Sequence, residues 1–331
     1  GRFHPVADPF RQPARALRTL IGPIGNLGDK LRIAGLRRDC LKGTSADQLD
    51  GSDESTLAYL QARGFSPAIL DRFFRPFLGG IFLDPDLATT SRMFRFVFRM
   101  FSSGDVIVPA RGMGAIPGQL ADRLPTGTIR LNTRVTEIGS GRVVLESGEV
   151  LATSSVVVAT DGARAAAMVP EVTAPDWCPV QCLYYAVPEA PIAEPVLVLD
   201  GEGGGPINNL VFPTRVAPEY GPGKEDLASV TVVGPLAADP DRLQDEVEAQ
   251  LRDWFGGSVD GWRHLRTYRI ARALPRQGPG WLDPPSRTPG TEPGVFVVGD
   301  HLETASTNGA LASGRRTAAR VLEHLGRRND G

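Results

Sequence analysis

Two short groups near the end of the chain have the residue types and spacing of a ligand site. Gly299 and Asp300 follow the apolar run Val295–Val298, and Asn308, Gly309 and Ala310 come after a short loop. The apolar run predicts a buried strand, and open α/β sheets bind ligands at the carboxyl ends of their strands. A helix that begins near Asn308 would favour an anionic or electron-rich group at its N-terminus. The segment Val295–Leu325 therefore predicts a cofactor site, although close packing of small residues explains it equally well.

A second set of predicted strands must hold this segment in place. The alternating apolar residues of Ile129–Ile138 predict a strand, Gly139–Gly141 a turn, and Arg142–Glu146 and Val150–Thr160 two further strands. Thr160 and Asp161 end the last of these strands. They are candidates to face a ligand, but a simple turn is the plainer interpretation.

These two regions resemble the flavin amine oxidase superfamily. The pattern GD, short loop, S-x-N-G-A-x-x-S-G-R is similar to its C-terminal FAD-contacting segment, closest to the protoporphyrinogen oxidase and phytoene desaturase branch. Pro109–Ile138 is similar to the family's P-x-G-G-M block and the strand after it, with Arg111 in place of the first glycine. The resemblance implies an FAD-dependent oxidoreductase, with FAD contacts at Val135, Thr160, Gly299, Asp300, Thr307, Asn308, Gly309 and Ala310.

The resemblance also implies the chemistry. We expect hydride removal from an apolar small molecule, of the isoprenoid or tetrapyrrole type, with no side chain that stands out as an acid or base. An amine oxidase is an alternative, but Ala305–Asn308 lacks the aromatic residue that the amine-binding cage usually carries. A protein that binds a prenyl group or lipid without catalysis, as Rab GDP-dissociation inhibitors do, is another.

The rest of the chain divides into a helical part and a strand-rich part. From Arg11 to Met100 helix signals dominate, with Asp53 as the predicted cap of the helix that contains Leu57. Short predicted strands separated by Pro and Gly follow between Asp176 and Pro285, with one helix after Asp239. By the resemblance, this part is a substrate domain, and the candidate pocket residues are Phe77, Phe82, Tyr184 and Tyr268. Ordinary core packing is the simpler interpretation of each.

The predicted fold is a two-domain α/β (α+β) structure. Segments 109–165 and 286–331 are assigned to an incomplete Rossmann-like FAD-binding domain, and 1–108 and 166–285 to the substrate domain. The G-x-G-x-x-G motif that binds the pyrophosphate is not found. We therefore expect the dinucleotide-binding unit to precede Gly1, and these residues by themselves to be inactive.

Composition limits the other classes. With 36 Lys and Arg against 38 Asp and Glu, the net charge is −2, which does not suggest a nucleic-acid partner. Cys178 and Cys182 have no further ligands nearby, so no metal site is predicted. We expect a cytoplasmic protein, with peripheral membrane contact as an open alternative. His301 is interpreted as an exposed loop histidine rather than a proton-transfer group.

Overall fold

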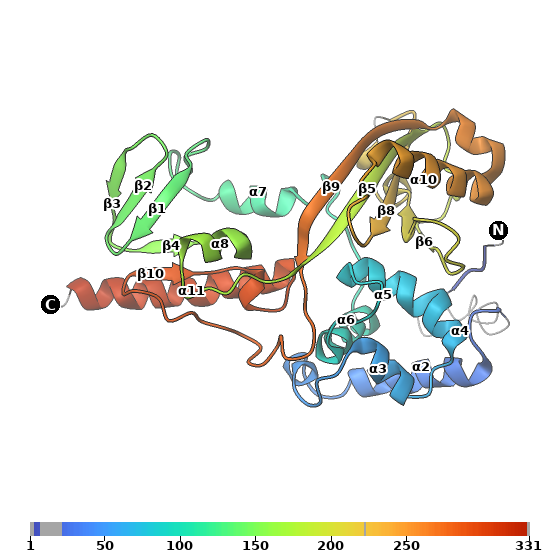
Figure 1. Ribbon diagram of the computed structural model, residues 1–331, viewed down its shortest axis with the longest axis horizontal. Coiled ribbons are helices and arrows are strands. Elements are labelled where there is room, and N and C mark those ends of the chain that lie inside the picture. Colours follow the sequence, from blue (N-terminus) through green and yellow to red (C-terminus); the bar gives the residue numbers. More distant parts are fainter. Residues whose placement is uncertain (1–2, 7–21, 222, 330–331) are drawn as a thin grey trace. The chain divides into compact units, whose positions relative to one another are not determined.

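The computed structural model describes residues 3–6, 22–221 and 223–329 (Figure 1). The chain forms two compact units, and each is built from two stretches of sequence. Unit 1 comprises Gly1–Ala115 and Cys178–Ala273, and unit 2 comprises Ile116–Trp177 and Leu274–Gly331. The predicted boundaries after residues 108, 165 and 285 therefore fall after residues 115, 177 and 273. The α/β two-domain class is confirmed, whereas the helix signals predicted over Arg11–Ile21 lie outside the described residues.

The first stretch of unit 1 is helical. The Ser55 hydroxyl caps α3 by accepting a hydrogen bond from the Ala58 N–H at 3.1 Å. The prediction of Asp53 as this cap was wrong, because the Asp53 carboxylate instead accepts the Thr90 hydroxyl. A π-helical turn, η2, lies between α4 and α5, and Leu83 ends α5 in the left-handed conformation. The helices are α2 (Leu27–Cys40), η1 (Ala46–Leu49), α3 (Thr56–Ala62), α4 (Pro67–Ile69), η2 (Leu70–Phe74), α5 (Arg75–Phe82) and α6 (Ser91–Ser103).

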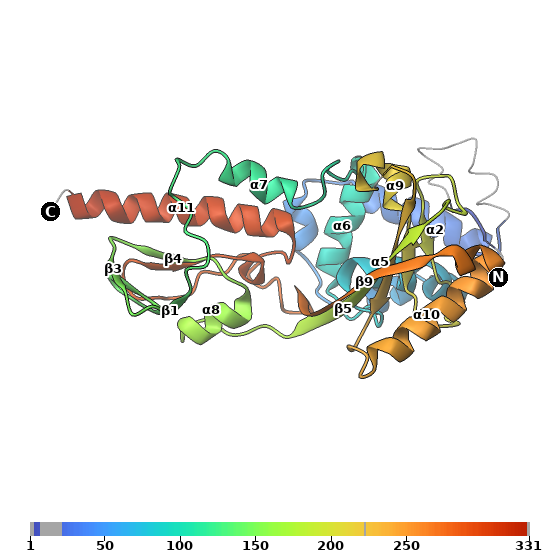
Figure 2. The ribbon, with the colours of Figure 1, turned by 90° about the horizontal axis from the view of Figure 1, so that it is seen from above.

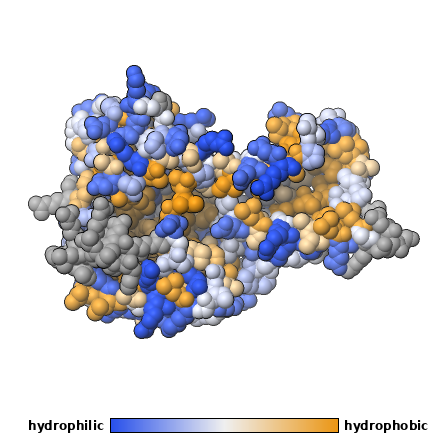
Figure 3. Space-filling model, turned by 180° about the vertical axis from the view of Figure 1, so that it is seen from behind, coloured by the Kyte–Doolittle hydropathy of each residue, from blue (hydrophilic) through white to orange (hydrophobic). Residues whose placement is uncertain are grey.

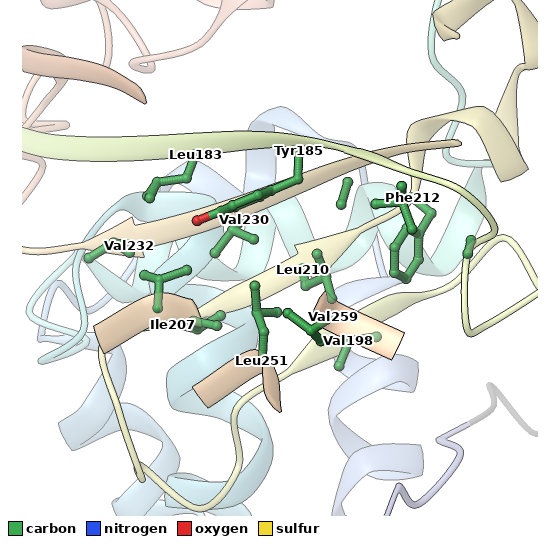
Figure 4. Close-up of a cluster of buried hydrophobic side chains, with 14 of the residues drawn as sticks. Leu183, Tyr185, Val198, Ile207, Leu210, Phe212, Val230, Val232, Leu251 and Val259 are labelled. Atoms are coloured by element: carbon green, nitrogen blue, oxygen red, sulfur yellow. The ribbon is translucent and has the colours of Figure 1, made fainter. Parts of the chain in front are cut away.

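The second stretch of unit 1 forms a five-stranded sheet in the order β6-β7-β8-β5-β9. Successive side chains of β8 alternate between buried and half-buried, so one face of the sheet is packed and the other is partly open. The packed face lies against α10, where Leu183, Tyr185, Val230 and Leu251 belong to one core cluster (Figure 4). The elements are β5 (Trp177–Val187), β6 (Leu197–Leu199), β7 (Asn209–Val211), α9 (Pro213–Val216), η3 (Pro218–Tyr220), β8 (Asp226–Val233), α10 (Pro240–Phe255), η4 (Gly256–Gly261) and β9 (Arg263–Pro275).

Unit 2 contains two small sheets. One is antiparallel, in the order β1-β2-β3, and the other is the parallel pair β4 and β10. Their shared core includes Val156, Val158, Ala165 and Val297. The elements are α7 (Ala115–Ala121), β1 (Val135–Gly139), β2 (Arg142–Leu145), β3 (Val150–Ala152), β4 (Val156–Val158), α8 (Gly162–Met168), β10 (Val295–Val297), η5 (Asp300–Leu302) and α11 (Thr307–Asn329).

The longest helix of unit 2, α11, packs beside β10 (Figure 2). The ring of Phe296 on β10 meets His324 of α11 edge-on, with 5.9 Å between ring centroids. Val157 of β4 is 44% exposed, so one face of the parallel pair is partly open. Figure 3 shows hydrophobic side chains at the surface of this unit. The exposed leucines of unit 2 include Leu120, Leu124, Leu131, Leu311 and Leu322.

Two predicted strands are shorter than expected. Within Ile129–Ile138 only the part from Val135 onward is a strand, because Leu131 and Asn132 form a turn in which Asn132 has a φ of 53°. Leu131 is 79% exposed, so its apolar side chain contributes nothing to a core. Val150–Thr160 divides into β3 and β4, which pair in different sheets. In the parts of the chain described, no helix has the length and apolar content to cross a membrane.

Candidate functional site

The carboxyl ends of β4 and β10 form the centre of the candidate site. Val158 of β4 is in register with Val297 of β10, and the strands are parallel. Thr160 and Asp300 therefore leave the sheet at the same edge, within unit 2. This is the edge at which open α/β sheets bind ligands. The structure thus brings together two of the predicted cofactor contacts that lie far apart in the sequence.

The turn after β10 is shaped by the ring of His301. A Cβ atom on Gly299 would lie 2.5 Å from Cε1 and Nδ1 of this ring, and one on Gly162 would lie 2.8 Å from its Cγ. Gly299 has a φ of 162°, an extended conformation that any residue adopts. Position 299 is therefore restricted by the neighbouring imidazole rather than by its backbone.

His301 is buried, which corrects the prediction of an exposed loop histidine. Its side chain and backbone together are only 2% exposed. Neither ring nitrogen has a hydrogen-bond partner among the residues that the structure describes. Burial lowers the pKa of the imidazole, an effect that nearby Asp300 opposes and Arg287 reinforces. Burial therefore favours the neutral form of the ring.

Asp300 directly follows Gly299 and begins η5. Burial raises the pKa of its carboxyl group, and His301 partly opposes that rise. Asp161, at the corresponding place after β4, is the N-cap of α8: its Oδ1 accepts the N–H groups of Ala163 and Arg164, each at 3.1 Å. The Thr-Asp-Gly sequence therefore begins a helix. Asp300 and Thr160 remain available to a ligand, as a half-buried and an exposed residue respectively.

The start of α11 supplies the third part of the site. Gly309 donates its N–H to Ser306 Oγ at 3.0 Å, and Ala310 donates its N–H to the Ser306 carbonyl at 2.9 Å. The N–H groups that point out of the helix start are consequently those of Thr307 and Asn308, which are exposed. Gly309 is restricted to glycine because the Thr304 carbonyl lies where its Cβ would be. The absence of a side chain at position 309 thus makes room for the backbone of the loop that precedes α11.

An irregular segment that the sequence analysis did not single out supports η5. The guanidinium of Arg287 stacks over Trp281, with its Cζ 4.1 Å from the ring centroid. Trp281 donates Nε1–H to the Glu303 carbonyl at 3.1 Å, and Arg287 donates its backbone N–H to the Leu302 carbonyl at 2.8 Å. These contacts fix the residues just after Asp300. Arg287 and Trp281 lie in a Pro-rich stretch without helical or strand periodicity, so the sequence does not predict that they support η5.

The other predicted residues lie elsewhere. Val135 begins β1, in the antiparallel sheet of unit 2. In unit 1, Tyr184 and Tyr268 are neighbours on β5 and β9, with an edge-to-face distance of 5.7 Å between ring centroids. Phe77 on α5 stacks with Phe73 at 5.3 Å. Phe82 is only 2% exposed and belongs to the helical core, so it offers little surface to a substrate.

Unit 2 has features that fit a flavin cofactor. A half-buried carboxyl, an exposed hydroxyl and a long helix start meet at the end of a parallel strand pair, and His301 is a buried polar group without a partner among the described residues. Thr307, Asn308, Asp300 and Thr160 would hold polar parts of the cofactor through side-chain oxygens and backbone N–H groups. The donor set suits a polar, electron-rich ligand rather than an apolar one.

Comparisons with known proteins identify that ligand. The family model for flavin-containing amine oxidoreductases matches residues 1–322. An oxidoreductase structure from Methanosarcina mazei is 17% identical, covers 88% of this chain and 72% of its own, and has a TM-score of 0.66. A protein assigned as a protoporphyrinogen oxidase from an Exiguobacterium species is 15% identical over 92% of this chain and 73% of its own, with a TM-score of 0.63.

A putrescine oxidase structure is 14% identical over 92% of this chain and 77% of its own, also with a TM-score of 0.63. At these identities the structures establish the fold. No curated protein sequence matches the chain. Because the family model matches nearly the whole chain, the protein belongs to the family of flavin-containing amine oxidoreductases, and its cofactor is FAD.

Proposed function

We propose that the protein oxidises an apolar small molecule by hydride removal and that FAD lies against Thr160, Asp300 and the start of α11. The single observation that carries the proposal is the convergence of Thr160 and Asp300 at the carboxyl edge of the parallel pair β4 and β10. FAD, when bound, supplies the hydride acceptor. The chain's own contribution is to orient the cofactor through Asp300 and through the N–H groups of Thr307 and Asn308. Gly299, Gly309, Ala310 and the backbone of Val135 complete the proposed contacts.

The substrate would meet the open face of the sheet in unit 1. Cys182 is opposite Thr231 and Tyr184 is opposite Ser229 on the face that does not pack against α10. Tyr268 is 44% exposed and carries Arg266 over its ring at 4.8 Å. A surface of aromatic rings and small side chains suits a large, mostly apolar molecule of the tetrapyrrole or polyene type. The side chains that we assign to it are Phe77, Tyr184 and Tyr268.

Flavin retention tests the cofactor assignment. We expect the complete, purified protein to absorb visible light as a flavoprotein, and Asp300→Ala in that protein to lower the ratio of bound FAD to protein. Asp161→Ala is the matched control, because Asp161 occupies the equivalent turn after β4 but is used as a helix cap. Unchanged occupancy in Asp300→Ala would contradict the placement, and a colourless protein that binds prenyl lipids would favour the non-catalytic alternative.

Amine oxidation is the second candidate, favoured by the description of the matching family. Within unit 2, the residues Ala305, Ser306 and Thr307, which lead into α11, include no aromatic side chain to enclose an amine. Supplying the protein with putrescine or cyclohexylamine and measuring peroxide separates the candidates. Peroxide release with these amines, and none with a porphyrinogen or a polyene, would replace our proposal with an amine oxidase.

A further inference from the structure

A buried histidine with no hydrogen-bond partner among the described residues calls for an explanation, because buried polar groups are normally hydrogen-bonded. In this protein it is His301, located where the chain leaves β10. The space around its ring is defined by two glycines from different parts of unit 2. A side chain at Gly162 or Gly299 would collide with the imidazole, and Pro175 closes the space beside Gly162.

The two glycines belong to the two turns that carry the cofactor contacts. Gly162 follows Thr160 and Asp161 at the end of β4, and Gly299 precedes Asp300 at the end of β10. The His301 ring touches both turns, whereas the direct backbone pairing between the strands ends with the Val298 N–H, which bonds to the Val158 carbonyl at 3.0 Å. Beyond this bond the imidazole links the two turns.

We propose that His301 is a positioning residue for FAD: its ring is the spacer that sets the separation between the Thr160 turn and the Asp300 turn. The inference rests on the proposed cofactor placement and goes beyond it by assigning a task to a residue whose ring atoms are enclosed by the protein. It acts through Thr160 and Asp300, and it takes no part in the reaction.

The enclosure also gives the spacer a preferred protonation state. A second proton would place a charge in a space with no acceptor for it, since both ring nitrogens lack partners among the described residues. The charged groups that face the ring are Asp300, Asp161 and the guanidinium of Arg287. Arg287 Nη2 is 3.4 Å from the His301 carbonyl oxygen, so a cation already lies close to this residue. Acid therefore disfavours the native position of the ring.

Three variants separate a spacer from a hydrogen-bonding or merely structural residue. His301→Leu keeps much of the side-chain volume but cannot titrate, His301→Ala removes the spacer, and Asp300→Asn removes the neighbouring carboxyl titration. The dissociation constant of FAD from the complete protein is measured by flavin fluorescence between about pH 8 and about pH 5, the range in which an imidazole titrates. Circular dichroism confirms that each variant is folded.

We expect His301→Ala to weaken FAD binding about tenfold or more at every pH, which is a change of about 1.4 kcal/mol. We expect His301→Leu to bind within about threefold of the wild type at the upper pH, a difference of under about 1 kcal/mol, and to lose the wild-type weakening in acid. Asp300→Asn should bind more weakly but retain the acid dependence.

Two results overturn the inference. If His301→Leu binds FAD as poorly as His301→Ala, the ring nitrogens and not the spacing are required. If His301→Ala binds as tightly as the wild type, the turns need no spacer. Both results differ from failure of the proposed function, in which the wild-type protein itself binds no FAD.

Discussion

The backbone carbonyl of Thr304 occupies the space that a Cβ atom on Gly309 would need. The loop that precedes α11 therefore folds back directly over the first turn of its own helix. The approach is possible because residue 309 has no Cβ atom. It fixes the path of the chain through the exposed residues Thr307 and Asn308, which lie between Thr304 and Gly309. It is a relationship between two backbone segments of unit 2 and involves no ligand.

Gly309→Ala should therefore destabilise unit 2. Overpacking of this kind costs about 1–3 kcal/mol, because the methyl group and the Thr304 carbonyl cannot both keep their positions. The matched control is Gly314→Ala in the same helix, where no atom of the described chain lies within 4 Å of the added Cβ. In Gly314→Ala we expect a gain of about 0.5–1 kcal/mol from helix propensity. Urea unfolding measures both changes, and equal effects of the two variants would contradict the structure.

The contact between Gly299 and His301 predicts non-additive mutations. Gly299→Ala should lower the melting temperature in the wild-type background, since the new methyl group would collide with the imidazole. In the His301→Ala background the same substitution should have almost no effect, because the colliding ring is gone. A coupling free energy above about 0.5 kcal/mol in this double-mutant cycle is expected for residues in direct contact. Additive effects would mean that the ring lies elsewhere.

Asp29 should contribute to stability in a pH-dependent way. It is fully buried, and its Oδ2 accepts the Ser66 hydroxyl at 2.6 Å while its Oδ1 accepts the Ser66 N–H at 2.9 Å. Burial, the largest single effect, opposes ionisation, but the bonds from Ser66 and Asn26 together hold the pKa of Asp29 below its ordinary 3.8. The stabilisation is therefore complete above this value and is lost as the pH falls through the lowered pKa.

We expect Asp29→Asn to reduce the free energy of unfolding by about 1–3 kcal/mol at neutral pH. The difference from the wild type should shrink as the pH falls below the ordinary value, because the wild-type carboxyl then becomes protonated. Denaturant titrations at several pH values measure it. A difference that stays constant into strong acid would show that Asp29 is not ionised in the native protein.

Cys40 should be unreactive in the native protein. It is 1% exposed, and burial raises the pKa of its thiol to about 11. Thiol reagents attack the thiolate, so at about pH 8 almost none of the reactive form exists and the reagent has no access. We expect mass spectrometry to find Cys40 labelled only after denaturant is added. Labelling at the rate of a free thiol before unfolding would contradict its burial.

Much of the fold is predictable from the sequence, for reasons visible in particular elements. The helix predicted after Asp239 is α10, which Asp239 caps, and the apolar run Val295–Val298 predicted β10. The strand prediction was wrong at Leu131, because this apolar side chain lies in an exposed turn and the alternation of apolar residues does not reveal a turn. Asp53 failed as a cap because Ser55, two residues later, bonds to the helix.

In the candidate site, too, some features are predictable from the sequence and others are not. Asp300 was identifiable because it follows an apolar strand and a glycine. The burial of His301 was not, because it depends on Gly162, which lies far away in sequence, and on the parallel pairing of β4 with β10. Local patterns contain no information about which two turns meet. The same holds for the stacking of Arg287 on Trp281.

The parallel pair β4 and β10 joins residues 156–158 to residues 295–297. Unit 1 contains no residue after Ala273, so all of its chain has been synthesised before β10 is made. Domains tend to fold as units during synthesis, in the order in which their residues emerge. β4 must therefore wait, without its strand partner, until β10 has been made. A chain that stops before Val295 would contain all of unit 1 but lack the Asp300 turn, so we expect that it would not retain the flavin.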